Sequence, residues 1–324
     1  EALLRAGHNV IEVNTELDWT FPNGNPNPED YNSLKTLGRA VLKEEADLGV
    51  STDGDGDRVG LVDEDGKEIY PDKAAMVIID GILDKMKDPR VVIDLKSTGA
   101  WERWDRFKSA GGEVVVVPTG HYYTKFGAKK FGLPHWFERS GHFGLGDPYG
   151  YSYDDANLAA LAFAYAVSKA GRPVSEILAG FPVSYQSPNM QAATTDEAKY
   201  GIVGKVVAKM REDQSNRVTV RGQKIKQILT MKDFADFAQT LGMPGPEGYG
   251  GRIVFEDASW GLLRASANQP ALALLSESFT SEEMMRSIVM YLTDKLGNYG
   301  IIPGPKSEDG SFDQFINDWR SIQY

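Results

Sequence analysis

The sequence predicts an α/β protein, in which consecutive α/β domains with mixed or parallel sheets are followed by a smaller α+β C-terminal domain. In the first half of the chain, short runs rich in Val and Ile alternate with stretches of helical spacing. Strand, helix and strand at this spacing are typical of a crossover between parallel strands. Beyond residue 183 the pattern changes to a helix, several strands and a further helix.

Composition narrows the class of protein. The 324 residues are enough for two or three domains, and 41% apolar with 25% charged residues is typical of a globular protein with real cores. A net charge of −11 without any Lys/Arg block argues against nucleic-acid binding, and no apolar run is long enough to span a membrane. The absence of cysteine excludes disulfides and thiolate metal sites and fits a reducing cytoplasm.

The first predicted domain comprises residues 1–68. Residues 1–7 have the pattern of a helix end closed by a glycine, and residues 8–13 have that of a strand. We therefore expect a fragment of a longer protein, from which the preceding strand is absent. A helix is predicted at residues 30–45, because four apolar residues fall on one face: Leu34, Leu37, Val41 and Leu42.

The strongest motif lies between two predicted strands, residues 46–50 and 59–62. Asp53, Asp55 and Asp57 alternate with glycines, which let the backbone turn tightly enough for three carboxylates to converge. Three hard oxygen ligands suit Mg²⁺. A solvated acidic turn is the simpler alternative, but the apolar flanks argue against it. A hairpin turn is predicted after the loop, at residues 63–66.

An EF-hand calcium loop is the sharper alternative. Counted from Asp53, positions 1, 3 and 5 are Asp and position 12 is Glu64, as that loop requires. Position 6 should be Gly and is Arg58, and the flanks have the pattern of strands instead of helices. The sequence therefore favours magnesium over calcium.

The second predicted domain comprises residues 69–182, and the third, residues 183–324. A polar, proline-containing linker is predicted around residues 181–191. In the second domain we expect helices at 74–86, 101–110 and 155–170, and strands at 90–94 and 113–117. In the third we expect helices at 195–210 and 281–296, strands at 217–221, 251–255, 260–264 and 271–277, and a tail from 298 with a short helix at 312–319.

Two polar loops follow predicted strands, where open α/β sheets bind their ligands. His121 follows the second strand and is a candidate general acid or base, as histidine side chains often are, and Lys125 four residues on could contact a phosphate. Lys96 follows the first strand and could neutralise an oxyanion. A surface histidine and a surface lysine remain the alternatives.

Two further loops carry candidate binding residues. Glu138 and Ser140 could exchange hydrogen bonds with sugar hydroxyls next to His142, although a helix cap is the simpler interpretation. Arg264, Ser266 and Asn268 combine a forked donor, a hydroxyl and an amide, which is the chemistry of a phosphate site. Polar loops between strands are also common without any such role.

Taken in order, these motifs resemble the α-D-phosphohexomutase family, in particular its phosphomannomutase/phosphoglucomutase branch. The resemblance covers residues 1 to about 295. It rests on the segment from Phe21 to Glu29, the metal loop from Asp53 to Arg58, Lys96, the Gly120-His121 pair with Lys125, the Glu138-Arg-Ser140-Gly-His142 segment and the loop from Arg264 to Pro270.

The resemblance implies interconversion of hexose 1-phosphate and hexose 6-phosphate, with glucose or mannose, through a phosphoserine and a bisphosphate. Mg²⁺ would bind Asp53, Asp55 and Asp57, and Arg58 would orient that site. His121 would move protons with Lys96 nearby, Glu138, Ser140 and His142 would hold the sugar, and Arg264, Ser266 and Asn268 would bind the distant phosphate.

Two departures from the family pattern affect these expectations. The family's final loop has a Thr where Ala267-Asn-Gln269 stands here, and no serine stands in its Ser-His-Asn-Pro context. We therefore expect the N-terminal serine domain of the parent protein to be missing, and the chain alone to be inactive. The alternatives are a phosphoglucosamine mutase and a non-catalytic sugar-phosphate or Ca²⁺-binding protein.

Overall fold

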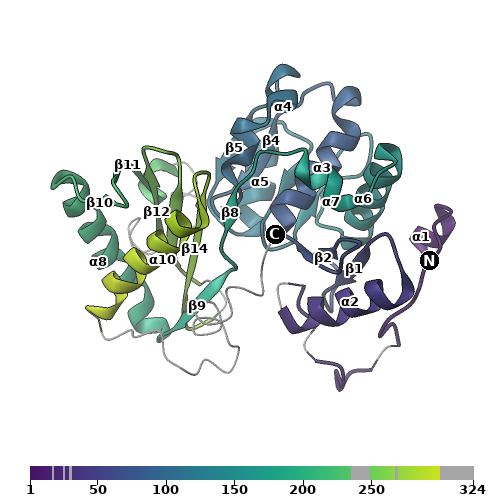
Figure 1. Cartoon of the computed structure of the whole chain (residues 1–324), viewed down its shortest axis with the longest axis horizontal. Helices are drawn as coiled ribbons and strands as arrows, with labels where there is room; N and C mark the ends of the chain where they lie inside the picture. Colours follow the sequence, from purple (N-terminus) through teal and green to yellow (C-terminus); the bar gives the residue numbers. More distant parts are fainter. Residues whose placement is uncertain (17, 25, 29–30, 235–248, 267–268, 300–324) are drawn as a thin grey trace. The chain divides into compact units, whose positions relative to one another are not determined.

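The computed structural model describes the chain except residues 17, 25, 29–30, 235–248, 267–268 and 300–324 (Figure 1). Asn268, residues 300–324 of the predicted tail and its helix at 312–319 thus lie outside the described residues. The chain divides into two compact units, Glu1–Pro182 and Val183–Tyr324. Within the described part of the chain, no helix combines the length and apolar character that crossing a membrane requires.

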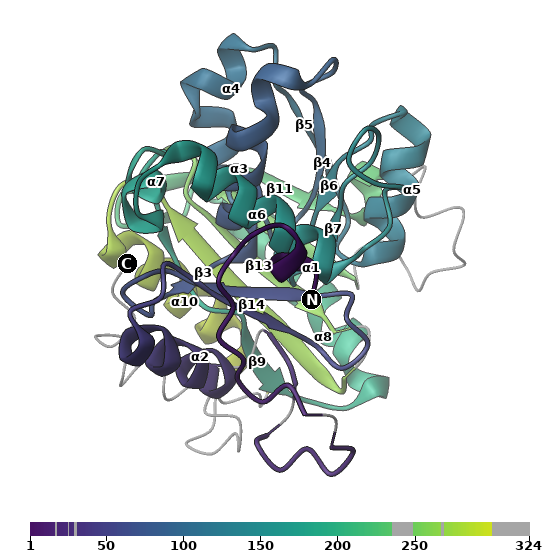
Figure 2. The same cartoon turned by 90° about the vertical axis from the view of Figure 1, so that its right-hand side faces the viewer.

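The first unit contains a small antiparallel sheet in the order β1-β2-β3, formed by Gly49–Thr52, Val59–Val62 and Glu68–Ile69. Figure 2 shows helix α2, Tyr31–Glu44, lying along this sheet. Leu34 and Val41 pack against Val62, but Leu42 is 58% exposed, so the prediction that it shares their helix face is wrong. Positions 34, 37 and 41 share one helix face, whereas Leu42 is rotated away from it.

The predicted strand at residues 8–13 is also wrong. These residues follow the short helix α1, Ala2–Arg5, but they pair with no strand in the described chain. Ile11 is 46% exposed, so this apolar residue is not in a core. A strand needs a neighbour to satisfy its backbone groups, and a strand-like composition alone supplies none.

The second sheet of this unit has the order β5-β4-β6-β7. Strand β4 is parallel to β5 and β6, and β6 is antiparallel to β7, so the sheet is mixed. The parallel pair confirms the predicted crossover. The strands are Val91–Asp94, Val114–Val117, Trp136–Phe137 and Phe143–Gly144, and the helices are α3 Pro71–Ile82, α5 His121–Phe131, α6 Ala156–Ala170 and α7 Val174–Ala179.

The helix predicted at 101–110 is interrupted. A 3-10 segment, Gly99–Arg103, and a short helix α4, Asp105–Ser109, are separated by Trp104 in an extended conformation. Trp104 is buried, and its ring contacts those of Trp101, Phe107 and Phe181. Burial of this aromatic cluster therefore overrides the helical spacing of the segment.

The second unit is built on an antiparallel sheet in the order β10-β11-β12-β13-β14-β8, with β9 also paired to β14. Helices α8, Asp196–Ser215, and α10, Glu282–Gly297, cover one face of it (Figure 1), and their apolar residues form the core of the unit. The strands are Tyr185–Gln186, Met190–Ala193, Thr219–Val220, Gln223–Thr230, Gly250–Phe255, Trp260–Ala265 and Ala271–Ser278.

These sheets and helices confirm the predicted fold class. Strand β11 was not predicted, because four of its eight residues are Lys or Gln and it alternates only weakly. Thr195 and Ser281 mark the starts of the two predicted helices. The side chain of Thr195 accepts from the N–H of Ala198, and that of Ser281 accepts from the N–H of Met284.

Candidate active site

The aspartate loop connects β1 to β2, as predicted. Thr52 pairs with Val59, and the loop between them closes on Asp53. Oδ1 of Asp53 accepts the backbone N–H groups of Asp57 at 3.1 Å and Arg58 at 3.0 Å. Gly56 has φ +76, a conformation that glycine adopts without strain. The turn is therefore organised by its own first carboxylate.

Arg58 fixes the same carboxylate from its other side. Its Nε donates to Oδ2 of Asp53 at 2.6 Å, and its Nη1 donates to Oδ1 of Asn27 at 3.1 Å. Burial raises the pKa of Asp53, but the hydrogen bonds and charge of Arg58 outweigh burial and hold it below its ordinary value. Asp53 is therefore ionised, as a metal ligand must be.

The three loop carboxylates lie together. One oxygen from each of Asp53, Asp55 and Asp57 falls within 4.8 Å of the others. Burial, and then the neighbouring carboxylates, raise the pKa of Asp57 to about 6. Such crowding of negative charge is what a divalent cation relieves, and an all-oxygen donor set suits Mg²⁺. The residues therefore fit the expected metal.

A second polar cluster gathers around Asp154. Its Oδ1 receives Nζ of Lys125 at 2.7 Å, and its Oδ2 lies 3.1 Å from Nδ1 of His121 and 3.3 Å from Nδ1 of His142. His142 Nδ1 is also 3.5 Å from Oδ2 of Asp57, so the cluster adjoins the metal loop. Burial, followed by the proximity of His121, lowers the pKa of His142 to about 4.

Backbone contacts hold these loops side by side. The N–H of Val59 donates to Gly141, Arg58 and His142 form an isolated antiparallel bridge, and the N–H of Ala156 donates to Gly56. Gly141 has φ +98, and a Cβ there would lie 2.7 Å from the carbonyl oxygen of Val59. The segment from 138 to 142 is thus packed directly against the metal loop.

Glu138 is buried in that segment. It accepts from Ser140 Oγ at 2.7 Å and from Thr124 Oγ1 at 3.1 Å. Burial, and then the charge of Asp94, raise the pKa of Glu138 to about 7, while Lys96 opposes that shift. The carboxyl can therefore change its protonation near neutral pH, and the helix-cap alternative does not describe this residue.

Lys96 is 3% exposed, so it is not a surface lysine. Around it lies a buried polar network, in which Asp94 accepts from Ser97 at 2.7 Å and from Thr119 at 2.9 Å. Arg139 pairs with Asp72 at 3.1 Å and stacks over the ring of Tyr70. This network fixes the carboxyl end of β4, where Lys96 begins its loop.

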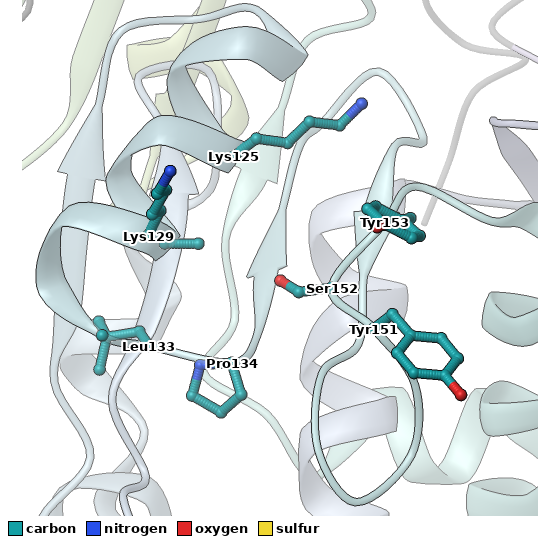
Figure 3. Close-up of a pocket in the computed structure, with 9 residues that line it drawn as sticks. Lys125, Lys129, Leu133, Pro134, Tyr151, Ser152 and Tyr153 are labelled. Carbon is teal, nitrogen blue, oxygen red and sulfur yellow. The ribbon is translucent and has the colours of Figure 1, made fainter.

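A pocket of about 440 Å³ opens beside helix α5. Figure 3 shows Lys125 and Lys129 projecting from the helix on one side, with Tyr151, Ser152 and Tyr153 on a loop opposite. Lys125 therefore lines this pocket and also pairs with Asp154. The combination of lysines and tyrosines gives the pocket donors for phosphate or sugar oxygens.

In the second unit, Arg264 lies near the end of β13 and Ser266 follows it. Ser266 donates its backbone N–H to Ala271, and the buried side chain of Lys199 donates to the carbonyl oxygen of Gln269. Nε of Arg264 is buried and has no hydrogen-bond partner among the described residues. Its Nη1 donates to the carbonyl oxygen of Ala265 at 3.4 Å, so the Nε–H is the group of this guanidinium left available to an anionic ligand.

Comparison with known proteins supplies the family. Residues 1–66 match the family model described as phosphoglucomutase/phosphomannomutase, alpha/beta/alpha domain II, and residues 70–185 match domain III of the same family. The chain belongs to the α-D-phosphohexomutase family. Its two matched segments carry the aspartate loop and the Asp154 cluster, in the order in which phosphohexomutases have these domains.

Among phosphohexomutase relatives, a phosphoglucomutase of Neisseria meningitidis is 29% identical over 282 residues, covering 86% of this chain and 54% of the relative. A phosphomannomutase/phosphoglucomutase of Pseudomonas aeruginosa is 30% identical over 281 residues, with 86% and 54% covered. The crystal structure of a family protein from Burkholderia thailandensis aligns at a TM-score of 0.68 and 26% identity, covering 91% of this chain and 56% of that one. The chain thus spans about half the length of these relatives.

Sequence reasoning missed Asp154, which joins three of the predicted site residues. The available signal was the Asp154-Asp155 pair before α6, of which Asp155 caps the helix by accepting from Asn157 and Leu158. Asp155 accounts for the start of the helix, so nothing in the local sequence indicated a role for Asp154. Thr124 and Asp94 were missed for the same reason: each contacts residues distant in sequence.

Proposed function

We propose that the protein interconverts hexose 1-phosphates and hexose 6-phosphates of glucose or mannose, using a phosphoserine from a segment outside these 324 residues. The observation that carries the proposal is the aspartate loop, closed by Arg58 and adjoining the His121, His142 and Asp154 cluster. Relatives named as phosphoglucomutase and phosphomannomutase/phosphoglucomutase support the same activity.

The aspartate loop would carry the cofactor. Asp53, Asp55 and Asp57 would hold Mg²⁺, which offsets negative charge on a phosphoryl group during transfer. Arg58 keeps Asp53 ionised and fixes its orientation. A bound Mg²⁺ and Arg58 would place positive charge locally, which would let a chain with a net charge of −11 accept anions.

His121 is the proposed proton shuttle. A neutral ring that donates from Nδ1 to Asp154 would leave Nε2 as the base. The His121 side chain is 50% exposed, so a substrate hydroxyl can approach it. Lys125, on the same helix and paired to the same carboxylate, would bind a phosphate oxygen next to that proton transfer.

Glu138 and Ser140 would hold the sugar. The carboxyl accepts from Ser140 and Thr124, and it retains acceptor capacity for a sugar hydroxyl. Lys96 would place a positive charge near this carboxyl, which lowers the pKa of Glu138 against the effect of burial. His142 would orient the metal-loop side of the sugar site through its contact with Asp57.

Arg264 and Ser266 would bind the phosphate that is not reacting, and Asn268 is proposed as a third donor. The buried Nε of Arg264 supports this role, because among the described residues it has no acceptor of its own. A forked guanidinium can bind a phosphate through two parallel hydrogen bonds. The mutase cycle would require this loop, since either phosphate of the bisphosphate must be held in turn.

The test is a coupled assay of the protein expressed from its complete reading frame, with Mg²⁺ and the 1-phosphates of glucose, mannose and glucosamine. We expect conversion of the glucose or mannose substrate, and none by the 324-residue chain alone. Preference for glucosamine 1-phosphate would make it a phosphoglucosamine mutase. Binding without any conversion by the complete protein would make it a non-catalytic sugar-phosphate protein and overturn the proposal.

A further inference from the structure

We propose that the chain has a second cation site, formed by His121, His142, Asp154 and Asp57, which binds a borderline transition-metal ion such as Zn²⁺ or Co²⁺. The ligand atoms of these residues all lie within 4.8 Å of one another. The donor set is two imidazoles and two carboxylates, unlike the three carboxylates of the aspartate loop. Imidazole nitrogens suit zinc, cobalt and nickel, whereas an all-oxygen set suits magnesium.

Three of the distances between the ligand atoms are close to the edge of a tetrahedron. Oδ2 of Asp154 is 3.1 Å from Nδ1 of His121 and 3.3 Å from Nδ1 of His142, and the latter is 3.5 Å from Oδ2 of Asp57. A tetrahedral zinc ion with ligands at about 2.0–2.1 Å has ligand-to-ligand edges of about 3.3–3.4 Å. These three distances are those of ligands around a single ion, and all four ligand atoms lie within 4.8 Å of one another.

One potential metal-ligand atom of the cluster, Nδ1 of His142, is not used in any hydrogen bond among the described residues. Nδ1 of His142 is buried and makes no hydrogen bond within the described part of the chain, despite the two carboxylates beside it. Asp154 uses Oδ1 for Lys125 and presents Oδ2 to both imidazoles. An ion at the centre would satisfy Nδ1 of His142 and both Oδ2 atoms together.

The site is accessible and is rigidly built. The His121 side chain is 50% exposed, which gives an ion a route in, whereas those of His142 and Asp154 are 15% and 10% exposed. The bridge between Arg58 and His142 fixes the second histidine to the metal loop. Under the function proposed above, an ion here would withdraw His121 from proton transfer, so the site would inhibit the enzyme.

The test uses the purified 324-residue chain and Co²⁺ alone, whose visible spectrum distinguishes four-coordinate from six-coordinate binding. Asp55→Asn removes a ligand of the aspartate loop only, so this variant should keep one four-coordinate Co²⁺. In that background, His121→Ala and Asp154→Asn should each weaken binding at least about 100-fold. His8→Ala, which changes a histidine outside the cluster, should have no effect.

The proposal is overturned if Asp55→Asn abolishes the four-coordinate spectrum of bound Co²⁺. It is also overturned if His121→Ala, added to the Asp55→Asn variant, leaves the affinity for Co²⁺ unchanged. His121 is exposed, so its replacement preserves folding even where Asp154→Asn does not. The measurement needs no catalysis, and it can therefore succeed or fail independently of the mutase activity. Displacement of Co²⁺ by Zn²⁺ should follow with the same variant pattern.

Discussion

Arg58 donates to both oxygens of Asp53: its backbone N–H reaches Oδ1 at 3.0 Å and its Nε reaches Oδ2 at 2.6 Å. The side chain of Asp53 is 3% exposed and that of Arg58 is 25% exposed, so the pair is largely removed from water. One residue thus organises the first carboxylate of the loop from both sides. We therefore expect the metal loop to depend on this pair before any ion binds.

Replacing Arg58 with Met tests that dependence. The variant keeps an unbranched side chain and removes the guanidinium, which leaves Asp53 as a buried charge with fewer partners. We expect a loss of about 1–3 kcal/mol in the free energy of unfolding, measured by urea denaturation without Mg²⁺. Lys67→Met is the control, because its pair with Asp65 is exposed and should contribute at most about 1 kcal/mol. Equal losses would contradict the account.

Gly141 is predicted to be irreplaceable for steric reasons. Gly141→Ala would place a methyl group 2.7 Å from the carbonyl oxygen of Val59 at φ +98, and would push the segment carrying Glu138 away from the metal loop. Gly132→Ala is the control, with φ +66 and no atom within 4 Å of its Cβ. The strain of a positive φ costs about 1 kcal/mol of stability in both variants. Only Gly141→Ala should also lose sugar-phosphate binding, measured by calorimetry.

Glu138 makes stability depend on pH in a predictable direction. Burial raises its pKa from 4.5 to about 7, so the folded state favours the protonated carboxyl. The stabilisation is complete below pH 4.5 and is lost as the pH rises through 7, because the unfolded chain ionises first. We expect the free energy of unfolding, relative to Glu138→Gln, to fall by up to about 3 kcal/mol between pH 4.5 and 8. A rise over that range would refute the assignment.

Arg264→Lys should separate phosphate binding from folding. Lysine keeps the charge but loses the fork and the buried Nε donor. In the complete protein we expect KM for the hexose phosphate to rise at least about tenfold, equivalent to about 1.4 kcal/mol, with unfolding little changed. Arg286→Lys, on the exposed face of α10 and paired with Glu282, should leave KM unchanged. An unaltered KM in the first variant would remove Arg264 from the site.

The sequence predicted the aspartate loop well because its chemistry is local. Asp53, Asp55 and Asp57 lie within five positions, between strands whose pairing follows from the hairpin itself. The helix starts at Thr195 and Ser281 are local in the same sense, since each cap contacts its own first turn. Such features need no knowledge of the rest of the fold.

Features that depend on distant partners were not accessible in this way. Asp154 is 33 positions from His121, and no spacing rule relates them. Trp104 leaves the helical conformation because its ring packs on Phe181, 77 positions on (181 − 104). Residues 8–13 have the composition of a strand but pair with no strand among the described residues. In each case tertiary contacts decide between conformations that the local sequence permits equally.

Under the proposed function, the aspartate loop serves phosphoryl transfer between the positions of a hexose phosphate. The most direct test measures conversion of glucose 1-phosphate to glucose 6-phosphate by the complete protein and by its Asp55→Asn variant, each with saturating Mg²⁺. A bound metal ion can stabilise the transition state by several kcal/mol, so its loss should lower kcat/KM at least about 100-fold. Folding should be preserved, because Asp55 is exposed. Equal conversion by the two proteins would contradict the account.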